Sequence, residues 1–169
     1  MRLLRRMIYL GIDPGRQGAV AALSGTSILD SRKLPFTGKD LDLHTLTAWL
    51  EALCDRHGCS VDSVVVAVEA LGSRPSPRMG AVSAITMGKN WGRLDGWLVG
   101  LGCRYDVVRP RKWQSVICPG STDPKVRSIA AARRLFPALD LTPGRKVKPD
   151  DNLADAAGLA EYARRTLGG

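Results

Sequence analysis

The sequence has few of the residues that build zinc sites or disulfide frameworks. It contains four cysteines and two histidines in 169 residues. No two cysteines have the C-x-x-C spacing of a zinc ribbon or a redox motif, and no histidine lies at zinc-ligand spacing from them. His44 and His57 lie on or beside the first predicted helix and are interpreted as structural or surface residues. The thiols are expected to be reduced. They are Cys54, Cys59, Cys103 and Cys118.

Long apolar runs are also absent. No stretch reaches the roughly 18 consecutive apolar residues of a membrane span. The basic start, "MRLLRRM", is not followed by the apolar region and cleavage site of a secretory signal. We therefore expect a cytoplasmic protein, either associated with the nucleoid or encoded by a phage in a bacterial host. A chain of this length predicts one domain over residues 1–169, and no repeat or long linker divides it.

Positive charge is abundant and concentrated in one segment. The formal net charge is +9. Residues 104–148 contain eleven Lys or Arg against three Asp, a local balance of +8. Other carboxylates lie in or beside apolar runs. Cations that bind phosphates, combined with isolated acids that do chemistry, are typical of an enzyme acting on a polyanion. A basic protein without such a role is the alternative.

Hydrophobic patterning predicts an α/β fold. Three short strands, at residues 7–13, 18–23 and 26–34, follow one another closely and are typical of an antiparallel meander. A helix over 40–57 precedes a β-branched strand that ends in Glu69. The later elements are a mobile loop at 72–80, a helix at 80–101, a strand at 103–110 and helices at 111–117, 124–136 and 150–165.

Several carboxylates are predicted to meet at one edge of this sheet. Asp13 ends the first strand and Glu69 ends the fourth, so they meet at the carboxyl edge if the two strands are adjacent and parallel. Asp151 and Asp155 are four residues apart on the last helix and share one face. Like charges this close cannot all stay ionised without a cation. Oxygen ligands without histidine favour Mg²⁺, with Mn²⁺ as a substitute, over zinc.

The order and spacing of five motifs resemble those of the RuvC-type Holliday-junction resolvases, a branch of the ribonuclease H-like superfamily. The motifs are "GIDPGRQGAVA", "VVVAVEAL", "VVRPRKW", "KVRSIAAARRLFP" and "DDNLADAAGLA". The similarity covers nearly the whole chain and is closest to phage and chloroplast-like members. The resemblance implies a five-stranded mixed sheet flanked by helices, a homodimer, and Mg²⁺-dependent cleavage of paired strands at a four-way DNA junction.

The resemblance also implies a catalytic tetrad that binds two metal ions, one to activate water and one to stabilise the departing 3′ oxygen. The matching acids are Asp13, Glu69, Asp155 and either Asp150 or Asp151. Bacterial housekeeping members have an acid or a histidine three residues before the last Asp, where this sequence has Asn152. The match therefore shifts to Asp151, as in chloroplast-like members. Helical geometry favours Asp151 as the ligand and leaves Asp150 as the helix cap.

Further residues are assigned to phosphate and DNA contacts by the resemblance. Lys125 matches a lysine of chloroplast-like members and is predicted to stabilise charge on the phosphate, with a solvated lysine as the alternative. The segment "MGKNWGRLDGW" resembles the junction-contacting helix, whose cations bind phosphates and whose aromatic ring stacks on bases. For Trp91 and Trp97 the alternative is a place in the core or in the dimer interface, and Trp113 is expected in the core. The predicted nucleic-acid contacts are Lys89, Trp91, Arg93, Arg111 and Lys112.

The leading hypothesis is thus a structure-specific endonuclease that resolves four-way junctions by symmetric nicking, without a small-molecule cofactor or a membrane. Two alternatives stay open. ATP-dependent kinases of the actin and sugar-kinase superfamily can also contain "GIDxG", but they are usually much longer and carry a second Gly-rich phosphate loop. A non-catalytic DNA-binding relative would have a degraded centre, whereas all four acids are available here.

Overall fold

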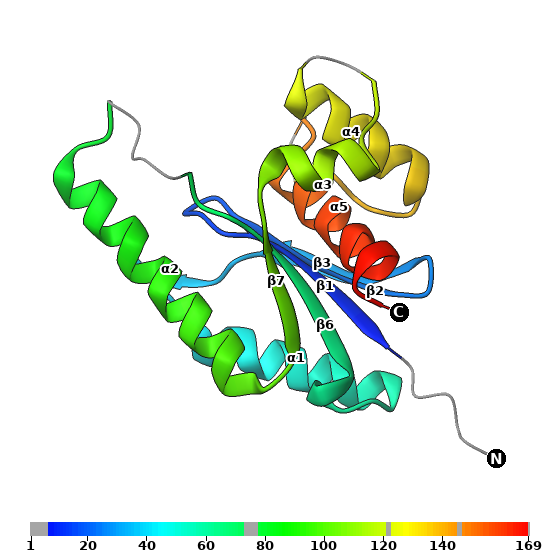
Figure 1. Cartoon of the computed structure of the whole chain (residues 1–169), viewed down its shortest axis with the longest axis horizontal. Helices are drawn as coiled ribbons and strands as arrows, with labels where there is room; N and C mark the ends of the chain where they lie inside the picture. The colour runs from blue at the N-terminus through cyan, green and yellow to red at the C-terminus, as the bar shows by residue number, and fades with distance from the viewer. Residues whose placement is uncertain (1–6, 73–77, 121–122, 145–146, 169) are drawn as a thin grey trace.

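A central sheet with helices on both faces forms the body of the protein (Figure 1). The computed structural model describes residues 7–72, 78–120, 123–144 and 147–168, and for residues 124 and 125 it describes the backbone alone. The sheet has five strands in the order β3-β2-β1-β6-β7. They are β1 (Ile8–Asp13), β2 (Ala19–Ser24), β3 (Ser27–Lys33), β6 (Val64–Glu69) and β7 (Arg104–Val108).

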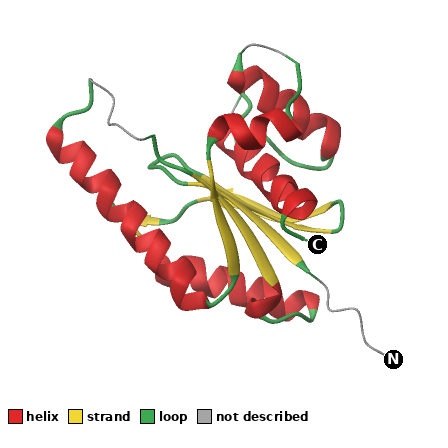
Figure 2. Cartoon of the chain, in the orientation of Figure 1, coloured by secondary structure: helices red, strands yellow, loops and turns green. Residues whose placement is uncertain are grey.

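The helices form two layers on opposite faces of this sheet (Figure 2). One layer contains α1 (Leu43–His57) and α2 (Ala81–Leu101), and a short 3₁₀ turn (Val61–Ser63) leads into β6. The other layer contains α3 (Pro110–Ile117), α4 (Pro124–Leu135) and α5 (Asp151–Thr166). The carboxyl ends of β1 and β6 point into the space between α2 and the layer of α3, α4 and α5 (Figure 1).

The pairing of the strands confirms the predicted mixed sheet. β1, β2 and β3 form an antiparallel meander. β6 pairs in parallel with β1, and β7 pairs in parallel with β6. Asp13 and Glu69 therefore end neighbouring parallel strands, as the sequence predicted.

One local prediction was wrong, because the first helix does not begin at residue 40. A small hairpin of β4 (Phe36–Thr37) and β5 (Asp40–Leu41) precedes it. Asp42 then caps the helix, since its Oδ1 accepts a hydrogen bond from the Thr45 N–H at 3.0 Å. The hairpin is too short to show an alternating pattern. Of the predicted loop at 72–80, residues 73–77 lie outside the described part of the chain.

The layer of α5 rests directly on β1 because the strand carries a glycine where the helix crosses it. A Cβ atom on Gly11 would lie 1.9 Å from the Ala156 carbonyl oxygen and 2.3 Å from the Ala160 nitrogen. Both distances are far below van der Waals contact, so no other residue fits without moving the helix. The alternate residues Ile8, Leu10 and Ile12 pack against the opposite layer.

Two expectations from the composition can be compared with the structure. All four cysteines are free thiols, and three of them are buried, so no disulfide is formed between them. Within the described residues, every helix is too short or too polar to span a membrane.

Candidate active site

A row of side chains crosses the carboxyl edge of the sheet. In the strand register, Asp13 on β1 pairs with Ala19 on β2, and Ala19 pairs with Lys33 on β3. On the other side, the parallel pairing of β1 with β6 places Glu69 next to Asp13. Directly paired residues project from the same face of a sheet. Because Ala19 packs in the core beneath α5, the whole row faces that helix.

Three of the predicted acids act electrostatically on the fourth, Asp13. The pKa of Asp13 is raised from its usual 3.8 to about 7 by burial first, and then by the negative charges of Glu69 and Asp155. Asp151 raises this pKa as well, while the positive charge of Lys33 lowers it. The structure therefore brings together the carboxylates of two strands and one helix around Asp13, which is partly protonated near neutral pH in the metal-free protein.

Glu69 is held in place by a tryptophan from α3. Burial raises the pKa of Glu69, and the hydrogen bond from Trp113 lowers it. The indole Nε1 of Trp113 donates to Glu69 Oε2 at 2.7 Å. Trp113 is fully buried, as predicted, and a Cβ on Gly158 would lie 2.7 Å from its ring. Sequence reasoning missed the hydrogen bond, although a buried indole N–H requires an acceptor and was the available signal.

Asp150 and Asp151 have different environments. Asp150 is the N-cap of α5, and its Oδ1 accepts hydrogen bonds from the backbone N–H groups of Asn152 at 3.1 Å and Leu153 at 3.2 Å. Lys33 Nζ lies 3.0 Å from the same oxygen. Asp151 begins the helix, is half-buried, and acts on the pKa of Asp13. The expected capping role of Asp150 is confirmed, and Lys33 is a site residue that sequence reasoning missed.

The donor set of this cluster fits a hard divalent cation. It consists of four carboxylates without a histidine, and the repulsion that the other three exert on Asp13 is the kind that a bound cation relieves. In the described part of the chain, no three His, Cys, Asp or Glu side chains already surround one point as metal ligands do. The chemistry of the donors matches Mg²⁺ or Mn²⁺ rather than zinc.

A hollow of about 470 Å³ opens beside the cluster, on the side of β3. Its walls include Lys33 and Lys148 together with Asp150 and Asp151 at the start of α5. The hollow therefore joins the acids to positively charged side chains, an arrangement that suits an approaching phosphate.

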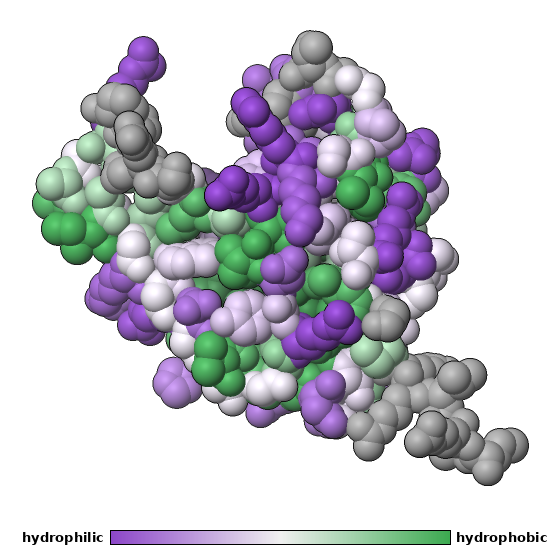
Figure 3. Space-filling model, in the orientation of Figure 1, coloured by the Kyte–Doolittle hydropathy of each residue, from purple (hydrophilic) through white to green (hydrophobic). Residues whose placement is uncertain are grey.

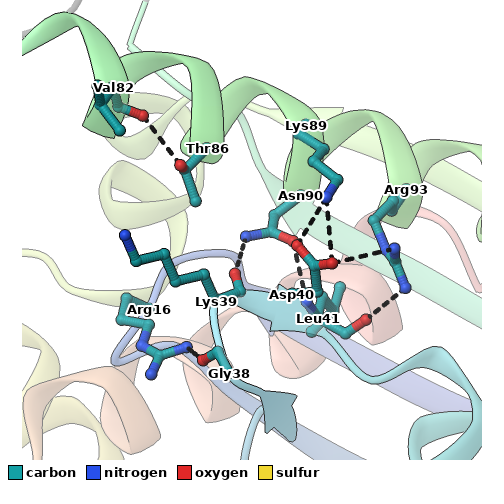
Figure 4. A network of polar contacts seen from close by, with 10 residues as sticks. All are labelled: Arg16, Gly38, Lys39, Asp40, Leu41, Val82, Thr86, Lys89, Asn90 and Arg93. Atoms are coloured by element: carbon teal, nitrogen blue, oxygen red, sulfur yellow. Dashed lines mark hydrogen bonds and ion pairs between the residues drawn. The ribbon is translucent and has the colours of Figure 1, made fainter.

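Two of the predicted DNA contacts, Lys89 and Arg93, bind the hairpin to α2 (Figure 4). Lys89 Nζ lies 2.9 and 3.1 Å from the two carboxylate oxygens of Asp40. Arg93 donates to the Leu41 carbonyl oxygen at 3.0 Å, and the Leu41 N–H donates to Asn90 Oδ1 at 2.9 Å. Both cations thus have acceptors within the chain, and a DNA contact from either one would compete with these bonds.

Arg16 ties the turn that follows Asp13 to the same hairpin. Its guanidinium contacts the Gly38 carbonyl oxygen and lies 4.8 Å from the centre of the Phe36 ring. Arg16 and Lys39 also line a largely apolar pocket of about 390 Å³ between the hairpin and the first half of α2. Trp91 lines this pocket too and packs against the core, which matches the core alternative for this residue.

The remaining predicted contacts lie on or near α3. Arg111 and Lys112 are exposed at its start, directly after β7 reaches the carboxyl edge, and Lys112 lies 4.0 Å from Asp106. Lys125 belongs to α4, but its side chain lies outside the described residues. In Figure 3, hydrophilic and apolar patches alternate over the layer of α3, α4 and α5, and apolar surface lies between that layer and α2.

Comparison with solved structures identifies the fold. No protein-family model and no curated protein matches the sequence. RuvC from Thermus thermophilus in complex with a Holliday junction substrate is similar over 96% of both chains, with 15% identity and a TM-score of 0.62. A further structure of Thermus thermophilus RuvC matches 96% of this chain and 97% of its own, with 16% identity and a TM-score of 0.63.

The yeast mitochondrial Holliday junction resolvase Ydc2 is also similar, with 17% identity and a TM-score of 0.55 over 95% of this chain and 78% of that chain. The similarity extends across both helical layers and the mixed sheet, as the sequence motifs predicted. The protein therefore has the ribonuclease H-like fold of the RuvC-type Holliday junction resolvases.

Proposed function

We propose that this protein is an endonuclease that recognises four-way DNA junctions and hydrolyses phosphodiester bonds in two opposed strands. The observation that carries the proposal is the group of four carboxylates at the open edge of a RuvC-type sheet, in which Glu69, Asp151 and Asp155 all raise the pKa of Asp13. Basic surface beside these acids supports DNA as the substrate. One of the similar structures is itself a complex of RuvC with a Holliday junction substrate.

In the proposed mechanism the four carboxylates would hold two Mg²⁺ ions, for which Mn²⁺ would substitute. When bound, the metal supplies activation of a water for in-line attack and stabilisation of the departing 3′ oxygen. The chain's own residues orient the ligands. Trp113 fixes the carboxylate of Glu69 through its indole N–H, and the Asp150 cap fixes the start of the helix that carries Asp151 and Asp155.

The decisive experiment compares a labelled four-way junction with a matched duplex, in Mg²⁺ and in EDTA. We expect cleavage of the junction alone, and only with the metal. Asp151→Asn is expected to lose at least about a hundredfold in cleavage rate, because it removes a proposed metal ligand. Asp150→Asn is the matched control one residue away. It is expected to keep its activity, because asparagine still caps the helix. It is expected to lose on the order of 1 kcal/mol of stability with the ion pair to Lys33.

The outcomes of this comparison separate the proposals. Binding of the junction without cleavage by the wild-type protein would contradict the nuclease and favour a non-catalytic DNA-binding relative. Loss of cleavage in Asp150→Asn, with activity kept in Asp151→Asn, would move the fourth ligand to Asp150.

We propose Lys125 as a residue that stabilises charge on the phosphate, to be tested by Lys125→Met in the same assay.

We propose that two copies assemble through α2, since cutting opposed strands in symmetry requires two centres related by a two-fold axis. One stripe of α2, within an arc of about 120°, carries the exposed residues Val82 (70%), Ile85 (71%) and Val99 (64%). Glycines at positions 88, 92, 96 and 100 lie on the same stripe, and a Cβ at each would meet nothing within 4 Å. A close helix–helix contact with a second copy would cover this stripe.

Trp97 does not belong to that stripe, because its indole donates to Thr47 Oγ1 on α1 at 2.7 Å. The glycines offer a cleaner test than Trp97 does. Gly92→Leu adds a side chain in open space, so the fold of one copy is expected to persist while the dimer dissociates. Light scattering at micromolar concentration measures the change. A wild-type monomer that still cuts junctions symmetrically would contradict the dimer.

We propose Arg111 and Lys112 as phosphate contacts, because both are exposed at the carboxyl edge of the sheet.

For Lys89 and Arg93 the bonds to Asp40 and Leu41 favour a structural role over the DNA role expected from the sequence. Lys89→Ala distinguishes the two roles. A structural lysine changes the melting temperature, whereas a phosphate contact changes the salt dependence of DNA binding. The same assay with Trp91→Ala tests stacking on bases.

A further inference from the structure

We propose that Lys33 is a positioning residue of this centre, which acts through Asp150 to fix the first turn of α5 and thereby the carboxylates on that helix. The inference rests on the proposed nuclease function for its catalytic consequence. Its structural basis is the ion pair between Lys33 and Asp150, which joins the last residue of β3 to the cap of a helix that begins far away in the sequence.

The register of the sheet explains how Lys33 reaches the helix. Lys33 lies in the same row as Asp13, with only Ala19 between them. The methyl side chain of Ala19 leaves room above β2, so the long lysine chain can extend toward α5 on the same face. Its Nζ ends 3.0 Å from Asp150 Oδ1 and close enough to Asp13 to lower the pKa of that carboxyl.

Asp150 needs a cation because it is buried. Its side chain is 5% exposed, against 32% for Lys33. The oxygen that meets Lys33 also accepts both capping hydrogen bonds of α5, and the Asp150 backbone N–H donates to the Leu141 carbonyl oxygen at 2.7 Å. Loss of the Lys33 charge would remove a compensating charge from a desolvated carboxylate at the point where the helix starts, and such a loss is destabilising at buried pairs.

The position of this cap sets the position of two proposed metal ligands. Asp151 is the next residue, and Asp155 lies one turn further along the same helix. Further along α5, the close contact with Gly11 holds the helix against β1. With its middle held there, a shift of the first turn changes the direction of Asp151 most. Lys33 therefore controls the geometry of the ligand set without being a ligand itself.

A direct contact between Lys33 and a DNA phosphate is the competing role, because Lys33 lines the hollow of about 470 Å³ together with Lys148. The two roles differ in what Asp150 does. If Lys33 serves mainly to neutralise Asp150, removal of both charges restores the centre. If Lys33 binds phosphate, removal of the Asp150 charge restores nothing, and the effect falls on KM.

The test is a double-mutant cycle of Lys33→Met, Asp150→Asn and the double variant, with Lys33→Arg as the conservative replacement. Lys148→Met is the matched control, since it removes a positive charge from the same hollow. Three quantities are measured for each: the melting temperature without metal, the Mg²⁺ affinity by calorimetry without DNA, and kcat and KM on the junction.

We expect Lys33→Met to lower the melting temperature, to weaken Mg²⁺ binding by about tenfold and to lower kcat by a similar factor at unchanged KM. The double variant is expected to recover most of all three losses, because asparagine still caps the helix and carries no charge. Lys33→Arg is expected to keep wild-type Mg²⁺ affinity, and Lys148→Met to change KM alone.

The proposal is overturned if the double variant binds Mg²⁺ as weakly as Lys33→Met, or if Lys33→Met raises KM and leaves melting and Mg²⁺ affinity unchanged. Melting and Mg²⁺ binding need no DNA, so they test the link between Lys33 and Asp150 independently of cleavage. If the double-mutant cycle gives the expected result in melting and in Mg²⁺ binding but the protein cuts no junction, the proposed nuclease function is contradicted and the positioning role is supported. If Lys33→Met does not fold, the Mg²⁺ affinities of Lys33→Arg and the double variant are compared instead. Affinity near that of the wild type in both supports the positioning role, and weak binding by the double variant overturns it.

Discussion

Asp13→Asn is expected to stabilise the metal-free protein while it abolishes cleavage. The pKa of Asp13 is raised to about 7 from its usual 3.8, because the folded chain buries the carboxyl among Glu69, Asp155 and Asp151. The folded state thus binds this proton more tightly than the unfolded state does. The contribution of this proton to the free energy of unfolding is therefore greatest below pH 3.8. It falls as the pH rises and is fully lost above about pH 7.

The size of the effect follows from the shift. One pKa unit corresponds to about 1.4 kcal/mol, so the shift of Asp13 sets a ceiling of about 4 kcal/mol on the cost of its charge. Partial contact with water reduces this, and we expect roughly half of it. Asparagine keeps the shape without the charge. For a chain of this length, the variant should then melt roughly 4 to 8 °C above the wild type at pH 8.

The assay is thermal unfolding in EDTA from pH 4 to pH 8.5. The advantage of the variant over the wild type should shrink toward pH 4, and added Mg²⁺ should stabilise the wild type more than Asp13→Asn. Asp55→Asn, on the exposed side of α1, is the control for loss of one carboxylate elsewhere. The reasoning is refuted if Asp13→Asn melts below the wild type at pH 8, or if the melting temperatures of the two proteins depend on pH in the same way. Asp13 would then not be destabilised by burial and by the neighbouring carboxylates.

Three further predictions concern the layer above the sheet and the DNA contacts. Gly11→Val should prevent α5 from docking, since a Cβ would lie 1.9 Å from a helix carbonyl oxygen, and circular dichroism should show loss of the cooperative transition. Trp113→Phe removes the 2.7 Å bond to Glu69 and should slow cleavage by about tenfold with little change in junction binding. An unchanged cleavage rate would contradict this role. Arg111→Ala and Lys112→Ala should each reduce the slope of log affinity against log salt by about 0.9, and an unchanged slope for both would make them solvated surface residues.

Much of the fold could be predicted from local sequence signals. The first two strands and the β-branched strand ending in Glu69 are apolar runs bounded by turn residues, and the parallel pairing of the first strand with the last of these places both acids as expected. The hairpin at residues 36–41 could not be predicted, because two residues per strand carry no periodicity. Its Asp40 is also the reason that Lys89 binds within the chain.

The parts of the site that sequence reasoning missed depend on contacts between distant segments. Lys33 becomes part of the centre only through the register of β1, β2 and β3 and the position of the α5 cap. Trp113 reaches Glu69 only because α3 follows β7 at the same edge of the sheet. The acids themselves were easier to find, since a carboxylate at the end of an apolar strand has no place in a core without a partner.

The close approach of α5 to β1 at Gly11 also determines when the centre can exist. Asp13 and Glu69 come from the first half of the chain, whereas Asp151 and Asp155 arrive on the last helix. Contacts between segments so distant in the sequence form late, because the loop between them must first be closed. A chain in which α5 has not yet docked carries only half of the carboxylates. If the protein is the nuclease proposed above, it cannot cut DNA until α5 has docked.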